Sequence, residues 1–108
     1  QSICKKIDSY SKVSILGISF KPDSPVTIGS PSVVLLEYLK TQDKEIYCHD
    51  FIDETFDNLK MFSNLEFKSY NIEECIENSD VVILMHPDKR YSQFDFSGVE
   101  VVDYWGIL

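Results

Sequence analysis

Apolar positions along the chain alternate between short continuous runs and longer stretches with helical spacing. The short runs are rich in β-branched side chains and predict five strands, at residues 13–20, 45–49, 65–68, 81–85 and 99–102. The first and fourth runs are almost entirely apolar, which is typical of strands covered on both faces, so both should be central. The alternation predicts a three-layer α/β domain with a five-stranded, mainly parallel sheet.

Helix signals stand between the predicted strands. Ser30 followed by Pro31 matches an N-cap and a first-turn proline, and apolar residues at helical spacing come after them. Asn71 with Glu74 three residues later matches a capping box. Residues 53–63 place acidic side chains in a first turn and aromatic and leucine side chains three apart. Three helices are therefore expected between the strands.

The composition of the chain mainly excludes classes of protein and of partner. A chain of 108 residues with 44% hydrophobic and 26% charged residues is typical of one globular domain. Ten Lys and Arg against eighteen Asp and Glu give a net charge of −8, which disfavours nucleic-acid and anionic-lipid partners. The chain shows no apolar run long enough to span a membrane and no secretory signal pattern, so a cytoplasmic location is expected. The start at Gln1 rather than Met predicts a piece of a longer polypeptide.

The cysteines point to no metal or disulfide chemistry. Cys4, Cys48 and Cys75 are odd in number and lack zinc-like spacing, so reduced and mostly buried thiols are expected. Cys48, His49 and Asp50 are adjacent on one predicted strand, and their side chains alternate between its two faces. They cannot close around one ion, and no metal site is predicted.

The segment between the first predicted strand and its helix is the candidate ligand loop. Residues 21–29 contain two prolines and a glycine and follow the carboxyl end of a strand, where open parallel sheets bind ligands. Only Gly17 is near, so the GxGxxG fingerprint of dinucleotide binding is absent. Lys21 together with Ser30 at the helix N-terminus fits a phosphate or a sugar hydroxyl. A solvated lysine beside a turn is the simpler alternative.

Other polar residues at the same predicted edge have two interpretations each. Asp50 suits a ribose hydroxyl, although a cap of the turn before the next helix is favoured. His86 suits a proton shuttle, although a loop histidine without a partner is favoured. Residues 88–90 are read as a solvated turn. Tyr104 and Trp105 fit base stacking and an aromatic plug or domain contact equally well.

A family resemblance appears at residues 13–39. Phe20-Lys21-Pro22-Asp23 at the end of a strand, with Ser30-Pro31 ten residues later, resembles the opening of the C-terminal domain of the UDP-glucose/GDP-mannose dehydrogenase family. Residues 45–50 (EIYCHD), 79–91 (SDVVILMHPDKRY) and 99–108 (VEVVDYWGIL) resemble later segments of the same domain. The resemblance covers nearly the whole chain from Lys12 onwards.

The resemblance implies a Rossmann-like, UDP-sugar-binding domain at residues 13–108, preceded at 1–12 by the end of a connector helix from an earlier domain. It implies a parent enzyme that oxidises the C6 hydroxyl of a nucleotide sugar to a carboxylate with NAD. In that family an N-terminal domain binds NAD and carries the catalytic cysteine, and a central domain mediates dimerisation. The resemblance therefore implies no catalytic residue in this chain, which would be inactive alone.

The resemblance also assigns substrate contacts. Phe20 would pack against the nucleotide sugar, Lys21 would supply charge, and Ser30 would present the helix N-terminus. The arginine that contacts substrate near the end of the domain falls at Trp105, and the arginine that reaches NAD falls at Ile28. No residue of this chain is therefore expected to bind the cofactor.

The loss of both arginines and the aromatic pair Tyr104-Trp105 also favours an alternative. Under it, the chain is a degenerate Rossmann-like module that packs against other domains or mediates oligomerisation and binds no ligand. An independent flavodoxin-like or receiver-like domain is disfavoured, because Phe20-Lys21 stands where a receiver needs acidic residues.

Overall fold

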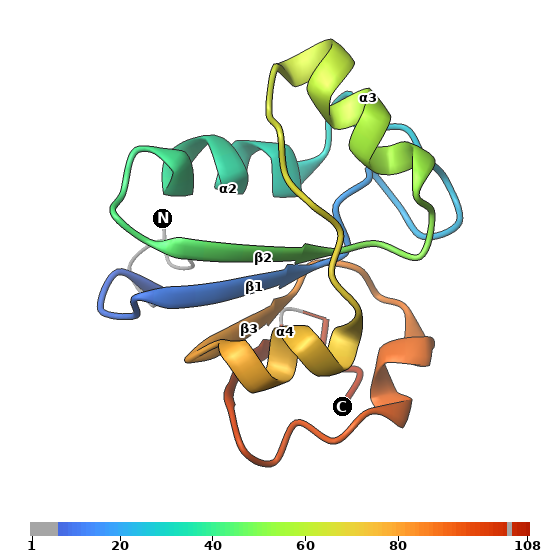
Figure 1. Cartoon of the computed structure of the whole chain (residues 1–108). Coiled ribbons are helices and arrows are strands. Elements are labelled where there is room, and N and C mark those ends of the chain that lie inside the picture. The colour runs from blue at the N-terminus through green and yellow to red at the C-terminus, as the bar shows by residue number, and fades with distance from the viewer. Residues whose placement is uncertain (1–6, 104) are drawn as a thin grey trace.

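The computed structural model describes residues 7–103 and 105–108, and its centre is one parallel sheet (Figure 1). The strands are β1 (Lys12–Leu16), β2 (Glu45–His49), β3 (Val81–Leu84) and β4 (Glu100–Asp103). Their order across the sheet is β2-β1-β3-β4, and every neighbouring pair is parallel. Ile15 pairs with Cys48 on one side and with Ile83 on the other. The prediction that the first and fourth apolar runs are central is confirmed, since they form β1 and β3.

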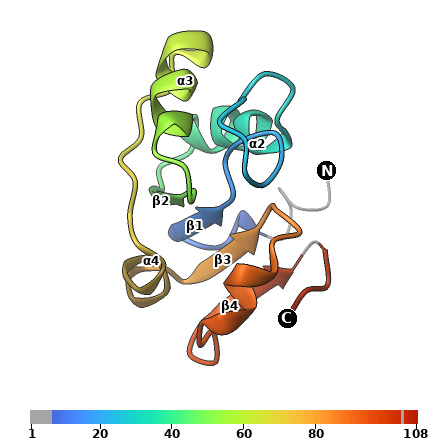
Figure 2. The ribbon, with the colours of Figure 1, turned by 90° about the vertical axis from the view of Figure 1, so that its right-hand side faces the viewer.

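Helices cover both faces of the sheet, as Figure 2 shows from the side. They are α2 (Pro31–Lys40), α3 (Glu54–Ser63) and α4 (Ile72–Asn78), with a short 3₁₀ helix, η1 (Lys89–Gln93), after β3. α2 and α3 lie on one face, and α4 lies on the other. The three-layer α/β architecture is therefore confirmed. No helix within the described residues is long and apolar enough to cross a membrane.

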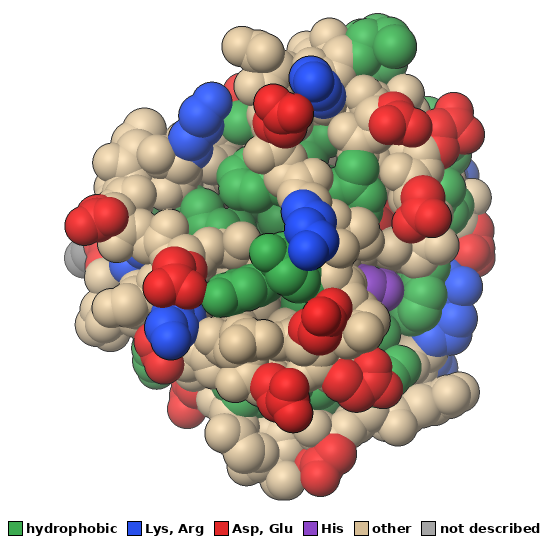
Figure 3. Space-filling view, in the orientation of Figure 1, with side chains coloured by type: hydrophobic (Ala, Val, Ile, Leu, Met, Phe, Trp, Pro, Cys, Tyr) green, Lys and Arg blue, Asp and Glu red, His purple; other side chains and the backbone are tan. Residues whose placement is uncertain are grey.

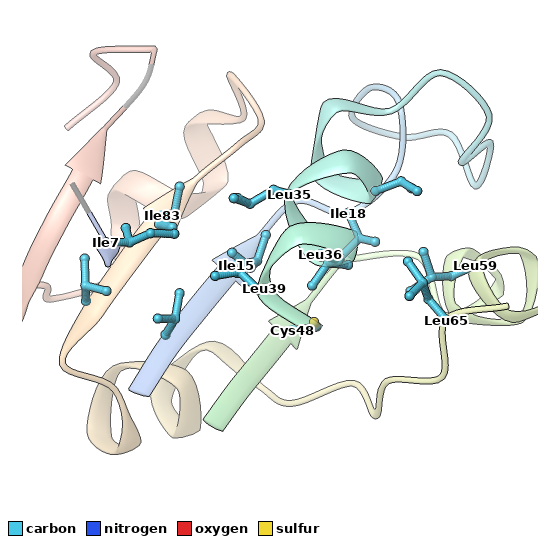
Figure 4. Close-up of a cluster of buried hydrophobic side chains, with 13 residues drawn as sticks. Ile7, Ile15, Ile18, Leu35, Leu36, Leu39, Cys48, Leu59, Leu65 and Ile83 are labelled. Atoms are coloured by element: carbon cyan, nitrogen blue, oxygen red, sulfur yellow. The ribbon is translucent and has the colours of Figure 1, made fainter. Parts of the chain in front are cut away.

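Each face of the sheet has its own hydrophobic core. Successive strand side chains point to opposite faces, so Val13 and Ile15 enter one core while Leu16 enters the other. The first core joins the sheet to α2 and α3 and is shown in Figure 4. Its central side chains are fully buried, among them Leu36, Leu39 and Leu59. The second core packs α4 and the segment after β3 on the opposite face.

The helix predictions are confirmed together with their start signals. The Ser30 side chain accepts the backbone N–H of Ser32, and Pro31 is the first residue of α2. Asn71 and Glu74 form the expected capping box of α4. Local side-chain chemistry therefore sets both starts.

The predicted strand at residues 65–68 is wrong, and the sheet has four strands instead of five. Only an isolated bridge forms there, between Ser69 and Cys48. Leu65 is buried and Phe67 packs on the first core, which explains the alternating pattern. The segment connects α3 on one face to α4 on the other, so it passes across the edge of β2 instead of running along it (Figures 1 and 2).

The connector helix predicted at residues 1–12 falls largely outside the described residues. Within residues 7–12, Ile7 is fully buried in the first core. The Lys44 ammonium donates to the backbone carbonyls of Ile7, Asp8 and Tyr10. The Tyr38 hydroxyl donates to Asp8 Oδ1 over 2.7 Å, so this segment is held against the domain by apolar packing, by the Lys44 cation and by a side-chain hydrogen bond.

Candidate ligand-binding edge

The carboxyl ends of the strands meet at one edge of the sheet. The chain leaves β1 toward β2 on one side, and β3 lies on the other side of β1. This is the switch point where open α/β sheets bind ligands. The segments that follow β1 (residues 17–30) and β3 (residues 85–88) flank it. Lys and Arg side chains, hydrophobic side chains and a histidine lie side by side at this end in Figure 3.

β1 ends earlier than predicted because the chain turns at Gly17. Gly17 has φ +94°, and its amide donates to the His49 carbonyl over 2.8 Å. His86 packs directly on Gly17 and is buried, and its Nε2–H donates to the Ser19 carbonyl over 2.7 Å. The interpretation of His86 as a loop histidine without a partner is therefore wrong. Its ring is built into the base of the ligand loop.

Asp50 holds the same turn from β2. Its Oδ2 accepts the amides of Ile18 and Ser19 at 2.9 and 3.0 Å, and its Oδ1 accepts the amide of Ile52 at 3.0 Å. Asp50 therefore does cap the turn before α3, but the N-cap position of α3 itself belongs to Asp53. The role of Asp50 in binding the β1 loop has no local sequence signal, since its partners lie more than thirty residues earlier.

The serines at the start of α2 complete this base. Ser30 is buried, and its hydroxyl donates to the Ile18 carbonyl over 2.7 Å while accepting the amide of Ser32. The Ser32 hydroxyl donates to the Gly17 carbonyl over 2.6 Å. The Ser30 hydroxyl is thus used inside the protein, and its effect is to fix residues 17–19 against the N-terminus of α2.

The loop beyond this base exposes the motif side chains. Phe20 lies over Gly29 and is 54% exposed, and its amide donates to the Val26 carbonyl over 2.6 Å. Lys21 is exposed, and its ammonium makes no ion pair with any described residue. Ile28 is exposed as well. Phe20 and Lys21 therefore face solvent next to a backbone whose residues 17–20 are hydrogen-bonded to the rest of the domain.

Trp105 closes the other side of the edge. Its Nε1–H donates to the Met85 carbonyl at the end of β3 over 2.8 Å, and half of the side chain stays exposed. The structure brings it to the same edge as the β1 loop, as predicted from the strand ends. Tyr104, its predicted partner, lies outside the described residues.

Residues 88–90 are more than the solvated turn predicted. The Arg90 guanidinium donates to both carboxylate oxygens of Asp88 and to Oδ1 of Asp23, which is 3.0 Å from Nη2. Its carbon centre lies 4.0 Å from the centre of the Phe51 ring. The hydrogen bond from Arg90 lowers the pKa of the Asp88 carboxyl, and the same pairing raises the pKa of Arg90.

His49 lies buried beneath this cluster. Its Nδ1 is 3.0 Å from the Tyr91 hydroxyl, and its ring makes an edge contact with Phe51. Burial lowers the pKa of His49, and this outweighs the opposing effect of the nearby Asp50 carboxylate. His49 is therefore a neutral, structural side chain.

The described cysteines are buried thiols away from the exposed side chains of the edge. Cys48 and Cys75 are free, buried thiols, as predicted, while Cys4 lies outside the described residues. Burial raises the pKa of both described thiols, that of Cys75 to about 11. Among the described residues, no three His, Cys, Asp or Glu side chains are placed to hold a metal ion together.

The fold and this edge define a Rossmann-like α/β domain with a ligand loop after its first strand. Residues 14–106 match the UDP-glucose/GDP-mannose dehydrogenase family, UDP binding domain, and the chain belongs to this family. The resemblance found in the Phe-Lys-Pro-Asp motif and the later segments is thereby confirmed.

Individual relatives agree with this assignment. The chain is 27% identical over 93 residues to the UDP-N-acetyl-D-mannosamine dehydrogenase of Methanococcus aeolicus, a match that covers 86% of this chain and 19% of the relative. The chain thus spans about a fifth of the length of that curated relative.

Two solved structures share the fold. A UDP-glucose dehydrogenase from Pyrobaculum islandicum superposes with a TM-score of 0.77 at 20% identity, covering 95% of this chain and 24% of that one. A ternary complex of GDP-mannose dehydrogenase from Pseudomonas aeruginosa gives 0.73 at 24% identity, covering 93% and 26%. At these identities the likeness establishes the architecture alone.

Proposed function

We propose that this chain is the nucleotide-sugar-binding domain of an NAD-dependent UDP-sugar 6-dehydrogenase. The parent enzyme would oxidise the C6 hydroxyl of the sugar to a carboxylate in the cytoplasm, and this domain would bind the nucleotide part of the substrate. The observation that carries the proposal is the exposed Phe20-Lys21 pair on a loop with a hydrogen-bonded base at the switch point of the sheet. The family membership and the dehydrogenase relatives support the same conclusion.

The side chains at the edge suit an aromatic, anionic ligand. Lys21 offers an ammonium without an acidic partner among the described residues, which favours a diphosphate. Phe20 and Trp105 offer exposed aromatic surface for a base or sugar face. Ser30 would act indirectly, because its hydroxyl already donates to the Ile18 carbonyl and so positions the loop. The net charge of −8 opposes an anion, so the local arrangement of Lys21 and backbone amides has to overcome it.

The described residues do not fit NAD. A dinucleotide pyrophosphate needs a glycine-rich turn after the first strand, and Ile18, Ser19 and Phe20 follow Gly17 instead. The acidic residue at the end of β2, Asp50, already accepts three backbone amides and is not available for a ribose hydroxyl. The cofactor of the parent enzyme would therefore be bound by the domains that precede this one. Those domains would also be the partners of this domain, and the parent enzyme would be a homo-oligomer.

Calorimetric titration of the chain with UDP-glucose, UDP-N-acetylglucosamine, UDP-N-acetylmannosamine and GDP-mannose tests the proposal. We expect one of them to bind, and Lys21→Ala to weaken its affinity about tenfold, equivalent to about 1.4 kcal/mol. Lys89→Ala is the matched control, because Lys89 is exposed and also lacks an ion pair within the described part of the chain. Absence of binding to all four, in this chain and in its full parent alike, would contradict the proposal.

A specific observation favours a second candidate, the packing module without a ligand. Phe20, Val26, Ile28 and Trp105 are all large, about half exposed or more, and lie in the segments that form the ligand edge. An apolar edge of this kind is typical of a protein contact. Sedimentation analysis discriminates the two: association that is abolished by Ile28→Ser, without any nucleotide-sugar binding, would favour the packing module.

A further inference from the structure

Arg90 joins the three segments that follow β1, β2 and β3. It lies after β3, pairs with Asp23 in the loop after β1, and stacks on Phe51 in the segment after β2. Both carboxylate oxygens of Asp88, two residues earlier, accept hydrogen bonds from the Arg90 guanidinium. Asp88 is 8% exposed, so this pair fixes the arginine from its buried side.

The ligand loop is held at three places. Its base, residues 17–19, is fixed by buried hydrogen bonds to Asp50 and Ser30. Asp23, farther along the loop, has φ +61° and makes its ion pair with Arg90. Beyond it, the Asn58 side-chain amide donates to the Pro25 carbonyl over 2.9 Å. A left-handed residue that is not glycine costs energy, so the Asp23–Arg90 pair also stabilises an unfavourable backbone conformation.

Phe20 and Lys21 lie between the base of the loop and Asp23. Pro22 follows Lys21 and restricts the backbone between Lys21 and Asp23. The position of Asp23 therefore determines the position of the Lys21 Cα. The hydrogen bond from the Phe20 amide to the Val26 carbonyl closes the loop that contains Asp23. If Asp23 moved, the side chains of Phe20 and Lys21 would therefore move as well.

We propose that Arg90 is a positioning residue: by holding Asp23 against Asp88 and Phe51, it fixes Phe20 and Lys21 for an anionic nucleotide ligand. The inference rests on the proposed function. Two acidic partners already occupy the guanidinium, so its task is to organise the loop. Lys21, which has no acidic partner within the described part of the chain, is the cation that meets the ligand. The Asp23 side chain is 78% exposed, so added salt should weaken the Asp23–Arg90 pair.

The test compares Asp23→Asn and Arg90→Met with Lys89→Met, which removes one positive charge next to Arg90 without breaking an ion pair. Asp23→Asn keeps the Asp88–Arg90 pair, and asparagine tolerates the left-handed conformation, so this variant folds even if Arg90→Met does not. Two quantities are measured on the whole chain: amide hydrogen exchange of Phe20 without ligand, and the affinity for the nucleotide sugar that the wild type binds.

We expect Asp23→Asn and Arg90→Met each to speed exchange of the Phe20 amide about fivefold and to weaken binding about fivefold. The double variant should show no further loss beyond that of Arg90→Met, because Arg90→Met already removes the Asp23 pair, together with the Asp88 pair and the Phe51 contact. Salt at 1 M should speed exchange in the wild type but not in Asp23→Asn. Lys89→Met should change neither quantity. Lys21→Ala should weaken binding while leaving exchange unchanged.

Wild-type exchange and affinity in both variants would overturn the inference, as would faster exchange with unchanged affinity. A wild type that binds no nucleotide sugar overturns the proposed function instead. In that case, hydrogen exchange of the Phe20 amide alone tests whether the Asp23–Arg90 pair anchors the loop. Faster exchange in Asp23→Asn supports the anchoring, and unchanged exchange overturns it.

Discussion

Gly17 lies directly against the imidazole of His86, so closely that a Cβ on Gly17 would be 2.4 Å from Cγ of the histidine. The same imidazole donates to the Ser19 carbonyl, two residues beyond the glycine. The turn at the end of β1 is therefore shaped by a side chain that follows β3. This contact ties the two central strands together at the edge where the ligand loop begins.

Gly17→Ala is expected to destabilise the domain by about 2–4 kcal/mol, because it combines a positive φ with a collision against a buried ring. Urea denaturation followed by circular dichroism measures the change. Gly98→Ala is the control, since a Cβ there meets nothing within 4 Å. Equal losses of stability in the two variants would contradict the role given to the His86 contact.

Asp50→Asn should destabilise the domain by about 2–3 kcal/mol, because an amide offers one acceptor oxygen where the carboxylate serves three amides. The loss should be accompanied by faster hydrogen exchange at Ile18 and Ser19. Asp53→Asn makes a matched comparison, since Asp53 is exposed and its side chain forms no capping bond to α3. Protected Ile18 and Ser19 amides in Asp50→Asn would refute this assignment.

Stability should fall as the pH drops below about 6.5. Burial lowers the pKa of His49 in the folded state, so the unfolded chain binds the proton more readily and acid favours unfolding. The fall continues until the pH reaches the lowered folded-state pKa. Urea midpoints between pH 5 and 8 measure it.

The control for this pH dependence is the double variant His49→Phe with Tyr91→Phe, which removes both partners of one buried hydrogen bond. Its stability should change less with pH over the same range. A pH profile identical to that of the wild type would show that His49 does not cause the effect.

Asn71→Ala should cost about 1 kcal/mol, because it removes the side-chain acceptor of the Glu74 amide and breaks the capping box of α4. Thermal unfolding detects this as a lower midpoint. Glu77→Ala, at an exposed position of the same helix, should change the midpoint little. A comparable loss in Glu77→Ala would mean that removing any polar side chain from this helix, and not the cap in particular, accounts for the change.

In a Cys4→Ser variant, the two remaining thiols should react with a disulfide reagent at pH 8 about 100-fold more slowly than a free thiol. Both are buried, and the pKa of Cys75 is raised to about 11, so little thiolate is present or accessible. Reaction at the normal rate should appear only in denaturant. Rapid labelling of the folded variant would show that these cysteines are accessible.

Local signals predicted those features whose partners lie within one helical turn. The N-cap at Ser30 and the capping box from Asn71 to Glu74 involve residues two and three positions apart, so their sequence spacing determines their geometry. The predicted strand at residues 65–68 fails for a related reason. Alternation of Leu65 and Phe67 shows only that one side of the segment faces a core, and it contains no information on whether another strand runs alongside.

At the candidate edge, too, the sequence predicted some features and not others. The sequence placed Phe20, Lys21, His86 and Trp105 at the edge formed by the carboxyl ends of the strands, and this is correct. Phe20 was expected as the last residue of the first strand and lies in the loop after it instead. The sequence did not reveal that Asp50 binds the amides after β1 or that Arg90 pairs with Asp23. The latter residues are 67 positions apart.

The sequence by itself thus determined the α/β class, the central position of β1 and β3, the helix starts and the motif that marks the family. Only the tertiary structure decided the number of strands, the base of the ligand loop and the partners of Asp50, His86 and Arg90. Periodicity and capping act over a few residues, whereas a buried or paired polar group takes whichever partner the folded chain brings within hydrogen-bond distance. At the ligand edge those partners come from separate strands, so their choice depends on the assembled sheet.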